Sequence, residues 1–479
     1  MIKISDSFKT DNKKLAALYS GARSTLLGAI KPFGDYSATV TSSESDRVTL
    51  KSELMSAETV ARYNMNAALD CVKIFLNTQR ADGRFASSIV KNQDGFFADY
   101  SGLAGLCFAE EALSIFYMSK KKELGFAEKL YDALERFDEY LWATHDKNFN
   151  GCLEAVDKNE ISDSSAAKYI AAEKEGESPF PVELAVVTAL AYRVKLTLSK
   201  ISEILVNGKA ELYSAEASAL LEKISVHFWN FEKCAFVDRD RKGRFFKTMT
   251  VDNLLVLYYG AASNDTAQAV MKRHLLDPEE FYTNMPFPQI VVGDPAFDLK
   301  VRADDYRRAL RAFEKYGFYS ELTELSGRFL SALSESLVFT EFYDCNSGEA
   351  YGAKLCADYA PAASAVLEMI ARSWGVSIEF DNIYGGALGH EENDSEYSLT
   401  WGGDTYKVLA EKDTTTGLFN DELVFTVTNG VRVITDWFGN SPKVVNITKE
   451  TIDCVFVYRD KTFSFTIEPG KIKSFKDMV

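Results

Sequence analysis

A glutamate set among aromatic residues is the feature of this sequence that most strongly suggests chemistry. Glu341 lies between Phe339 and the pair Phe342-Tyr343, directly after a helical pattern, in a segment with glycines at 348 and 352. Carboxylates cleave glycosidic bonds, and aromatic rings offer the flat apolar faces on which sugars are held. The segment therefore indicates carbohydrate chemistry. A solvated acidic turn between two helices is the alternative, because charge-rich turns commonly have no other role.

The charge and motifs of the chain disfavour several other classes of protein. The 479 residues include 70 acidic and 54 basic side chains, and the formal charge of −16 disfavours nucleic acid and anionic membranes as partners. The four histidines show no His-Glu-x-x-His spacing, no Gly-x-Gly-x-x-Gly follows a strand pattern, and neither a Walker-type loop nor Gly-x-Ser-x-Gly occurs. We therefore expect no zinc site, no nucleotide or other cofactor, and no serine hydrolase.

The termini, apolar runs and cysteines bear on the compartment. Residues 1–10 contain no apolar core of signal-peptide length, and no stretch approaches 18 uninterrupted apolar residues. The seven cysteines are scattered and never form Cys-x-x-Cys. We therefore expect a reduced, cytoplasmic protein without a membrane span. The sequence gives no indication of an oligomeric state.

The elements that must position Glu341 are mainly helical up to about residue 374. Apolar residues at three- and four-residue spacing predict a helix that Ser56 caps and that runs to Leu76. No short solenoid repeat is present, which argues against a repeat array. Similar patterns recur near 101–119, 126–142, 180–205, 214–230, 251–261, 265–275, 303–316, 319–336 and 357–373.

The pattern changes from helical to strand-like at about Gly375. Leu423, Phe425 and Val427 alternate with mostly polar residues, and the Asn429-Gly430 pair that follows predicts a hairpin. A second alternation over 452–467, with a turn at 459–461, predicts another hairpin. We predict an N-terminal helical extension over 1–50, a helical domain over 51–374 and an antiparallel β domain of sandwich size over 375–479.

Several segments match, in order, the motifs of one clan of glycoside hydrolases. The matching segments are Asp82–Phe85, Phe137–Trp142, Pro181–Leu184, Phe228–Asn230, His274–Phe281, Asp294–Asp298 and the loop around Glu341. Over most of 55–475 the chain resembles the clan of trehalases, oligosaccharide-processing α-glucosidases and mannosylglycerate hydrolases. The resemblance implies a mainly α protein, an (α/α)6 toroid followed by a small C-terminal antiparallel β-sandwich, with a carbohydrate as its partner.

The resemblance also implies which residues act. Glu341 corresponds to the clan's catalytic base, and Asp163, in Glu160–Ser165, is the counterpart of its general acid. Glu160 and Glu177, in the same connection, are the next candidates for the acid. The implied reaction is inverting hydrolysis of a small glycoside or oligosaccharide.

Side chains near the predicted helix ends and loops supply candidate substrate contacts. Aromatic residues at such positions can stack on sugars, and an arginine in the first turn of a helix can reach into the site. The expected substrate-binding residues are Trp142, Phe297, Arg302, Tyr343 and Tyr359.

The sequence departs from the clan's pattern in ways that leave alternatives open. Many members carry an aromatic-Arg-Gly run after the Asp-Pro-x-Phe segment, but here Asp298 is followed by Leu299–Arg302. Tyr359 stands where members commonly place a tryptophan. A catalytically inactive or weakened carbohydrate-binding relative is therefore the alternative. A lyase or epimerase on a toroid is a third reading, which the scarcity of histidine disfavours.

One segment resembles a calcium-binding loop. Between Asp146 and Asp157, oxygen donors occupy positions 1, 3 and 5, glycine position 6 and a carboxylate position 12. Position 12 is Asp157 rather than the usual bidentate glutamate. We expect no metal site and interpret the segment as a glycine-terminated helix connection.

Overall fold

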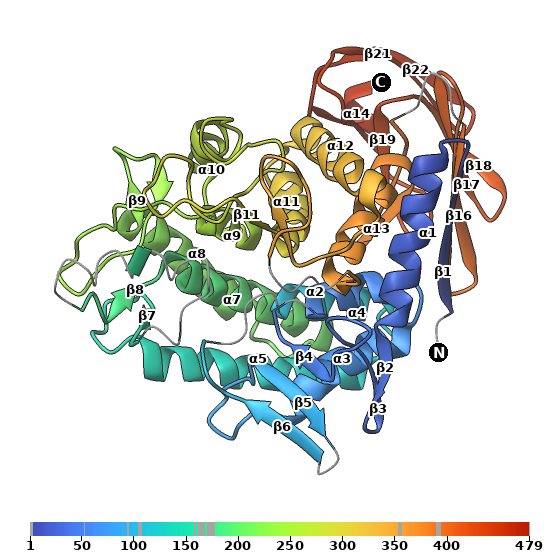
Figure 1. Cartoon of the computed structure of the whole chain (residues 1–479). Helices are drawn as coiled ribbons and strands as arrows, with labels where there is room; N and C mark the ends of the chain where they lie inside the picture. Colours follow the sequence, from blue (N-terminus) through green and yellow to red (C-terminus); the bar gives the residue numbers. More distant parts are fainter. Residues whose placement is uncertain are drawn as a thin grey trace.

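Six helices make a closed cycle of contacts in the computed structural model, which describes residues 3–51, 53–92, 95–103, 108–157, 160, 168–169, 178–352, 357–388 and 394–478. Each helix of this inner ring contacts the next, and the last contacts the first (Figure 1). The helices are, in chain order, α2 (Glu53–Val60), α4 (Ala109–Met118), α7 (Ala185–Leu205), α9 (Asp252–Tyr259), α11 (Ala303–Lys315) and α13 (Ala360–Trp374).

Further helices surround the inner ring. Most of them pack against an inner helix, and π-helix η2 (Met271–Leu275) continues one of them, α10. They are α1 (Lys13–Gly28), α3 (Met65–Asn77), α5 (Leu124–His145), α8 (Ala210–His227), α10 (Asn264–Val270) and α12 (Tyr319–Ser336). The inner helices are therefore enclosed, and all 15 residues of α13 are buried.

Buried ion pairs join the inner helices to one another. Arg307 on α11 lies 2.9 Å from Glu58 on α2 and 3.4 Å from Glu368 on α13. Glu58 also pairs with Arg311, one turn further along α11. A charge can be buried at tolerable cost only when it is paired and hydrogen-bonded, so these contacts explain how a strongly charged helix can lie inside the protein.

Two antiparallel sheets follow the ring. The order β1-β15-β16-β17-β18-β21-β22 forms a seven-stranded sheet, and β13-β14-β19-β20-β23 a five-stranded one. Buried apolar residues of both sheets, among them Val427, Phe456 and Val444, form one cluster. The strands are β1 (Ile4–Thr10), β13 (Val376–Glu379), β14 (Asn382–Gly385), β15 (Ser395–Trp401), β16 (Asp404–Ala410), β17 (Thr414–Phe419), β18 (Glu422–Thr428), β19 (Val431–Asp436), β20 (Lys443–Asn446), β21 (Ile452–Tyr458), β22 (Lys461–Ile467) and β23 (Ile472–Ser474), and α14 (Phe475–Met478) follows.

Short strands occupy the connections between the helices. They pair in small sheets, among them β4-β5-β6 and β11-β12. Their bounds are β2 (Ile30–Phe33), β3 (Tyr36–Thr39), β4 (Arg47–Thr49), β5 (Ser88–Asn92), β6 (Gly95–Asp99), β7 (Glu154–Ala155), β8 (Val182–Glu183), β9 (Trp229–Asn230), β10 (Ala235–Phe236), β11 (Lys300–Arg302) and β12 (Phe342–Asp344). No helix within the described ranges combines the length and the apolar composition needed to cross a bilayer.

The predicted change at Gly375 is confirmed, because α13 ends at Trp374 and β13 begins at Val376. The hairpin predicted over 452–467 is confirmed as β21 and β22. The single helix from Ser56 to Leu76 is wrong. The chain breaks after Val60, and the side chain of Asn64 accepts a hydrogen bond from the Ala67 amide to cap a second helix.

The N-terminal helical extension predicted over 1–50 is also wrong. Its described residues contain one helix, α1, and the strands β1 to β4. Strand β1 pairs antiparallel with β15, from Ile4 opposite Trp401 to Thr10 opposite Ser395. Figure 1 shows this first strand, in blue, beside the red strands of the C-terminal region.

The hairpin predicted at Asn429-Gly430 is wrong as well. Strand β18 pairs with β17 and β21, whereas β19 pairs with β14 and β20, so the turn carries the chain from one sheet to the other. The expected alternation also fails at one position. Gly417 pairs with Phe425 but Leu418 pairs with Leu423, so a bulge places Leu423 on the outside, where it is 53% exposed.

Candidate active site

Two short strands bring Arg302 and Glu341 together at the N-terminal end of α11. In the β11-β12 pair, Arg302 lies opposite Phe342, and Glu341 directly precedes β12. The Ala303 amide donates to the Glu341 carbonyl oxygen over 2.9 Å. These contacts place Arg302 Nη1 3.2 Å from Glu341 Oε1. Although far apart in sequence, the predicted base and one predicted substrate contact therefore form an ion pair.

The two partners of this pair differ in exposure. The Arg302 side chain is 7% exposed, whereas the Glu341 side chain is 40% exposed. Burial by itself would lower the pKa of Arg302, but the carboxylates of Asp304 and Glu341 outweigh burial and raise that pKa. Arg302 therefore stays cationic. The arrangement offers a carboxyl group that is 40% exposed and lies against a buried cation.

Carboxylates in the first turn of α11 support Arg302 from within. Asp304 and Asp305 are both 1% exposed. Asp304 Oδ1 accepts a hydrogen bond of 3.0 Å from the Tyr359 hydroxyl, and Asp305 Oδ2 accepts one of 2.7 Å from Gln289 Nε2. Acidic side chains are favourable at a helix N-terminus. Tyr359 thus orients a buried acid, and at 2% exposure it offers little ring surface to a sugar, contrary to its predicted role.

Lys51, in the connection between β4 and α2, belongs to the same group of charges. Burial, then the nearby guanidinium groups of Arg302 and Arg308, lower the pKa of Lys51 to about 8. Lys51 lies shortly before α2, and Tyr359 directly before α13. The N-terminal ends of α2, α11 and α13 therefore meet around Arg302, which pairs with Glu341.

A second charged cluster lies at the N-terminal ends of α7 and α9. Lys168 Nζ lies 2.6 Å from Asp238 Oδ2 and 2.9 Å from Asp252 Oδ2. Asp238 Oδ1 accepts a hydrogen bond of 2.8 Å from the Ala185 amide, the first residue of α7. Tyr169 donates to Asp238 over 2.9 Å. These contacts hold Lys168 and Tyr169 in place. Both residues follow shortly after Asp163, the predicted general acid, in the sequence.

Asp163, the predicted acid, lies outside the described residues, as does Glu177. Glu160 is described and is bound at the end of α5. Its Oε1 lies 3.4 Å from His145 Nε2, and its Oε2 accepts a hydrogen bond of 2.8 Å from the Val156 amide. Burial would raise the pKa of Glu160, but these two hydrogen bonds outweigh it and lower the pKa. A carboxyl group with a lowered pKa is poorly suited to donate a proton, which disfavours Glu160 as the acid.

Two of the predicted sugar contacts lie in structural positions. Tyr343 is 1% exposed, and its hydroxyl donates to the Val338 carbonyl oxygen and accepts from the Thr340 amide. Trp142 is a half-buried residue of α5, and its indole N–H donates to Asp138 over 3.1 Å. The burial of Tyr343 contradicts its assignment as a substrate-binding residue, whereas the role of Trp142 in binding remains a prediction.

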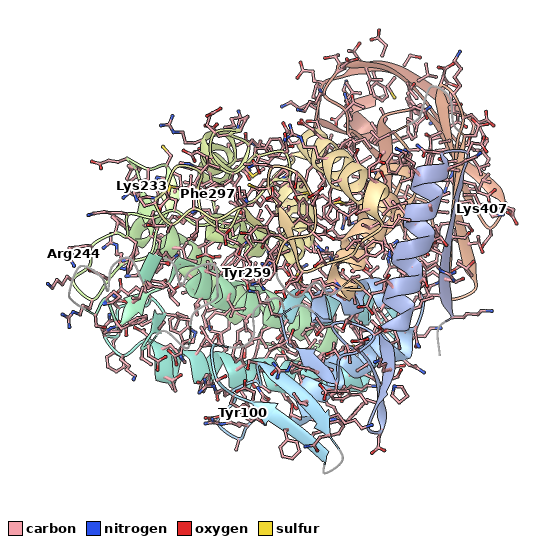
Figure 2. All side chains as sticks on the ribbon, viewed as in Figure 1. Tyr100, Lys233, Arg244, Tyr259, Phe297 and Lys407 are labelled. Carbon is pink, nitrogen blue, oxygen red and sulfur yellow. The ribbon has the colours of Figure 1, made fainter. Side chains whose placement is uncertain are left out.

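Phe297 is half-buried and packs against the main core cluster. Figure 2 labels it in the part of the molecule that also carries Lys233. The role of Phe297 in binding remains a prediction.

The segment that resembles a calcium loop is a hydrogen-bonded turn. Asp146 accepts from the amides of Asn150 and Gly151, and the Asn148 and Asn150 side chains donate to Glu183 over 3.2 and 2.5 Å. The oxygen atoms of Asp146 are thus used by the backbone of its own turn. Within the described part of the chain, no three His, Cys, Asp or Glu side chains are arranged to hold a metal ion.

Sequence reasoning missed Lys51, the acids of α11 and the cluster around Lys168. The pair Asp304-Asp305 was a signal, because adjacent acids at the start of a helix mark its first turn. Lys51, by contrast, reaches this site only through the closure of the inner ring. Neither its neighbours in sequence nor its type distinguishes it from a solvated lysine.

Comparison with known proteins identifies the architecture. A mannosylglycerate hydrolase from Thermus thermophilus, in complex with glucose, has a TM-score of 0.59 at 16% identity, over 74% of this chain and 99% of that one. Neutral trehalase from Saccharomyces cerevisiae has a TM-score of 0.55 at 12% identity, over 70% of this chain and 74% of its own. At such identities, the likeness concerns the fold alone.

A rhamnosidase from Bacillus sp. GL1 has a TM-score of 0.60 at 13% identity and covers 89% of this chain, although only 41% of its own length is matched. No curated protein matches the sequence. The model of one protein family matches residues 54–308, which is more than half of the chain and ends before Glu341. The chain therefore belongs to the family of mannosylglycerate hydrolase MGH1-like glycoside hydrolase domains.

Proposed function

We propose that the protein hydrolyses a small glycoside or oligosaccharide by an inverting mechanism, with Glu341 as the base and Asp163 as the acid. We further propose that the inner ring and its surrounding helices are an (α/α)6 toroid and that the two sheets form its C-terminal sandwich. The observation that carries the proposal is the open carboxylate of Glu341, backed by the buried Arg302 at 3.2 Å. A base must be accessible to water, and the Glu341 side chain is 40% exposed.

In the proposed reaction, Glu341 takes a proton from a water molecule as the water oxygen attacks the anomeric carbon. The bond from that carbon to the leaving oxygen breaks, and Asp163 gives its proton to the leaving oxygen. The configuration at the anomeric carbon is inverted, and the two carboxyl groups are expected to lie roughly 6.5–9.5 Å apart. Arg302 is a positioning residue in this scheme, because it contacts Glu341.

The position of the clusters supports this pair of roles. Glu341 lies with the N-terminal ends of α2, α11 and α13. Lys168, shortly after Asp163 in sequence, is bound at the ends of α7 and α9. Because inversion requires an acid and a base on two sides of the sugar, we expect the carboxyl groups of Asp163 and Glu341 to face each other across the bond that is cleaved. Mannosylglycerate is the first substrate to test, because the matched family is described by that activity.

The variant Glu341→Gln tests the base. It keeps the size of the side chain but removes its charge, so we expect turnover to fall by about 100- to 10,000-fold with little change in melting temperature. Glu349→Gln is the matched control, because Glu349 is an exposed acid of the same loop. It should retain full activity. Turnover would be followed on mannosylglycerate and a panel of aryl glycosides, with the first-formed anomer identified by NMR.

The outcomes separate the alternatives. Cleavage with retained configuration would mean that Glu341 does not act as a base toward water in the first step. Undiminished turnover in Glu341→Gln would exclude the residue altogether. If the unmodified protein binds sugars but cleaves no glycoside in the panel, the inactive carbohydrate-binding relative is the correct reading.

A further inference from the structure

A cavity of about 650 Å³ lies in the C-terminal β region, outside the inner ring. Its walls come from both sheets, since β20 and β23 belong to the five-stranded sheet and β21 and β22 to the seven-stranded one. Helix α14 completes it. Sites for small molecules commonly enclose about 300–1,000 Å³, so this volume suits a ligand of a few sugar units. The lining side chains that matter here are Lys443, Tyr458, Arg459, Lys461, Phe475 and Lys476.

The charge of this cationic cavity is opposite to that of the whole chain. Four basic side chains line it, but the only carboxylate in its lining is that of Asp460, in a protein with a formal charge of −16. Lys443, Arg459, Lys461 and Lys476 are all exposed. Across the described ranges, none of the four forms an ion pair with a carboxylate. An acidic protein that gathers unpaired cations around a cavity creates a local positive potential there.

Aromatic rings supply the apolar part of the same cavity. Phe475 is half-buried, and Lys461 Nζ lies 5.7 Å from the centre of its ring. Phe475 packs at 5.3 Å from Phe463, which holds the ring in place. The hydroxyl of Tyr458 donates a hydrogen bond of 2.7 Å to the Gly439 carbonyl oxygen, which holds its ring in place. Arg459 donates to Asn440 over 2.6 Å. A ligand here would meet flat apolar faces under a rim of cations.

We propose that the cationic cavity binds an acidic oligosaccharide, in which carboxylates on pyranose rings face the cations. The sugar faces would contact the apolar rings, and the carboxylates would pair with the lysines and arginine of the rim. The lining contains no residue of the elements around Glu341, so the cavity would hold the saccharide without cleaving it. The choice of a saccharide rests on membership of a glycoside hydrolase family, and the charge of the ligand rests on the four cations.

Calorimetric titration of the full chain with tetragalacturonate tests the proposal. We expect binding that weakens as salt is added, because exposed ion pairs are screened. The uncharged galactose tetramer should bind at least about tenfold more weakly. The double variant Lys443→Glu/Lys461→Glu should also lose at least about tenfold in affinity. The control Lys129→Glu/Lys412→Glu reverses the same number of exposed charges outside the cavity and should bind as the unmodified protein does.

Three results would overturn the proposal: no binding of tetragalacturonate, equal binding of the two tetramers, or an equal loss in both double variants. If inorganic phosphate binds but tetragalacturonate does not, the cavity holds a simple anion and no saccharide. Titration in the Glu341→Gln background shows whether binding needs the proposed active site. Turnover of a small neutral glycoside should be unchanged in Lys443→Glu/Lys461→Glu, so failure of hydrolysis and failure of this site can be told apart.

Discussion

The inner ring and the β region bury their interiors by different means. In the β region, strands such as β21 alternate buried Cys454, Phe456 and Tyr458 with more exposed residues, and the two sheets meet over an apolar cluster. In the ring, α11 is buried along nearly its whole length, although it contains three arginines and three acids. The ring is therefore closed by apolar packing together with ion pairs between helices.

This difference indicates how each region responds to change. An apolar cluster loses stability in proportion to the volume that is removed. A buried ion pair adds little stability compared with apolar packing. Removing one of its two charges is nevertheless very costly, because the other charge is left buried without a partner. The stability of the ring should therefore be sensitive to the loss of a single charge. The stability of the β region should depend on the shape of the substituted side chain and on the face of the strand that carries it.

The largest effect is expected when one charge of the ring is removed. Glu58→Gln keeps the shape of the side chain but leaves Arg307 and Arg311 without one carboxylate, so we expect a loss of about 3–5 kcal/mol in the free energy of unfolding. Glu396→Gln is the control in the β region, where Glu396 forms an exposed pair of 2.9 Å with Lys9. It should cost less than about 1 kcal/mol. Chemical denaturation measures both, and equal losses would contradict the distinction between the two regions.

A smaller, pH-dependent effect is expected at Glu111 on α4. Burial, followed by the carboxylates of Glu110 and Glu58, raises the pKa of Glu111 to about 8. The neutral form is favoured in the fold, so this contribution to stability is complete below the unfolded pKa and is lost as the pH rises toward about 8. Glu111→Gln should therefore gain stability relative to the unmodified protein by roughly 1 kcal/mol per pH unit between about pH 5 and 8.

Denaturation of both proteins at several pH values would check this expectation at Glu111. The gain should level off above about pH 8, where the native carboxyl group is already ionised. A constant difference across the range would show that Glu111 titrates as an ordinary carboxyl group and that the ring does not bury an unpaired acid.

The smallest effect concerns the bulge in β18. Leu423→Thr should change the free energy of unfolding by less than about 0.5 kcal/mol, because Leu423 is on the outside. Val427→Thr, in the same strand, places a hydroxyl group where the side chain is fully buried and should cost about 1–3 kcal/mol. If Leu423→Thr is the more costly change, the strand follows the simple alternation predicted from sequence.

Much of the fold could be predicted because the signals are local. The helices near 303–316 and 319–336 have period and end signals within their own sequences, and α11 and α12 follow them closely. Strand β1 escaped prediction because its alternation is interrupted by Asp6. That residue is buried, where the hydroxyls of Tyr19 and Tyr397 donate to it over 2.9 and 2.6 Å and Arg62 lies 3.8 Å away. Partners this distant in sequence cannot be inferred from a local pattern.

The candidate site shows the same limit. Glu341 was assigned as the base through the resemblance to the glycoside hydrolase clan, because no local sequence rule distinguishes a catalytic carboxylate in a loop from any other. Its pairing with Arg302 depends on β11 and β12, which have three residues each and are too short to give a strand signal. Tyr343 was misassigned because an aromatic residue near a helix end has the same sequence context whether it packs inside or faces a pocket.

Pairing of β1 with β15 has a consequence for synthesis of the protein. Residues 4–10 are synthesised long before their partners at 395–401, which follow only after the whole inner ring has been made. At about 5–20 residues per second, the interval is roughly 20–80 s. For that time, the nascent chain carries a strand with unpaired amide and carbonyl groups and with the apolar side chains of Ile4 and Phe8 uncovered. This segment is where a nascent-chain chaperone, or a mispairing with another copy, would act first.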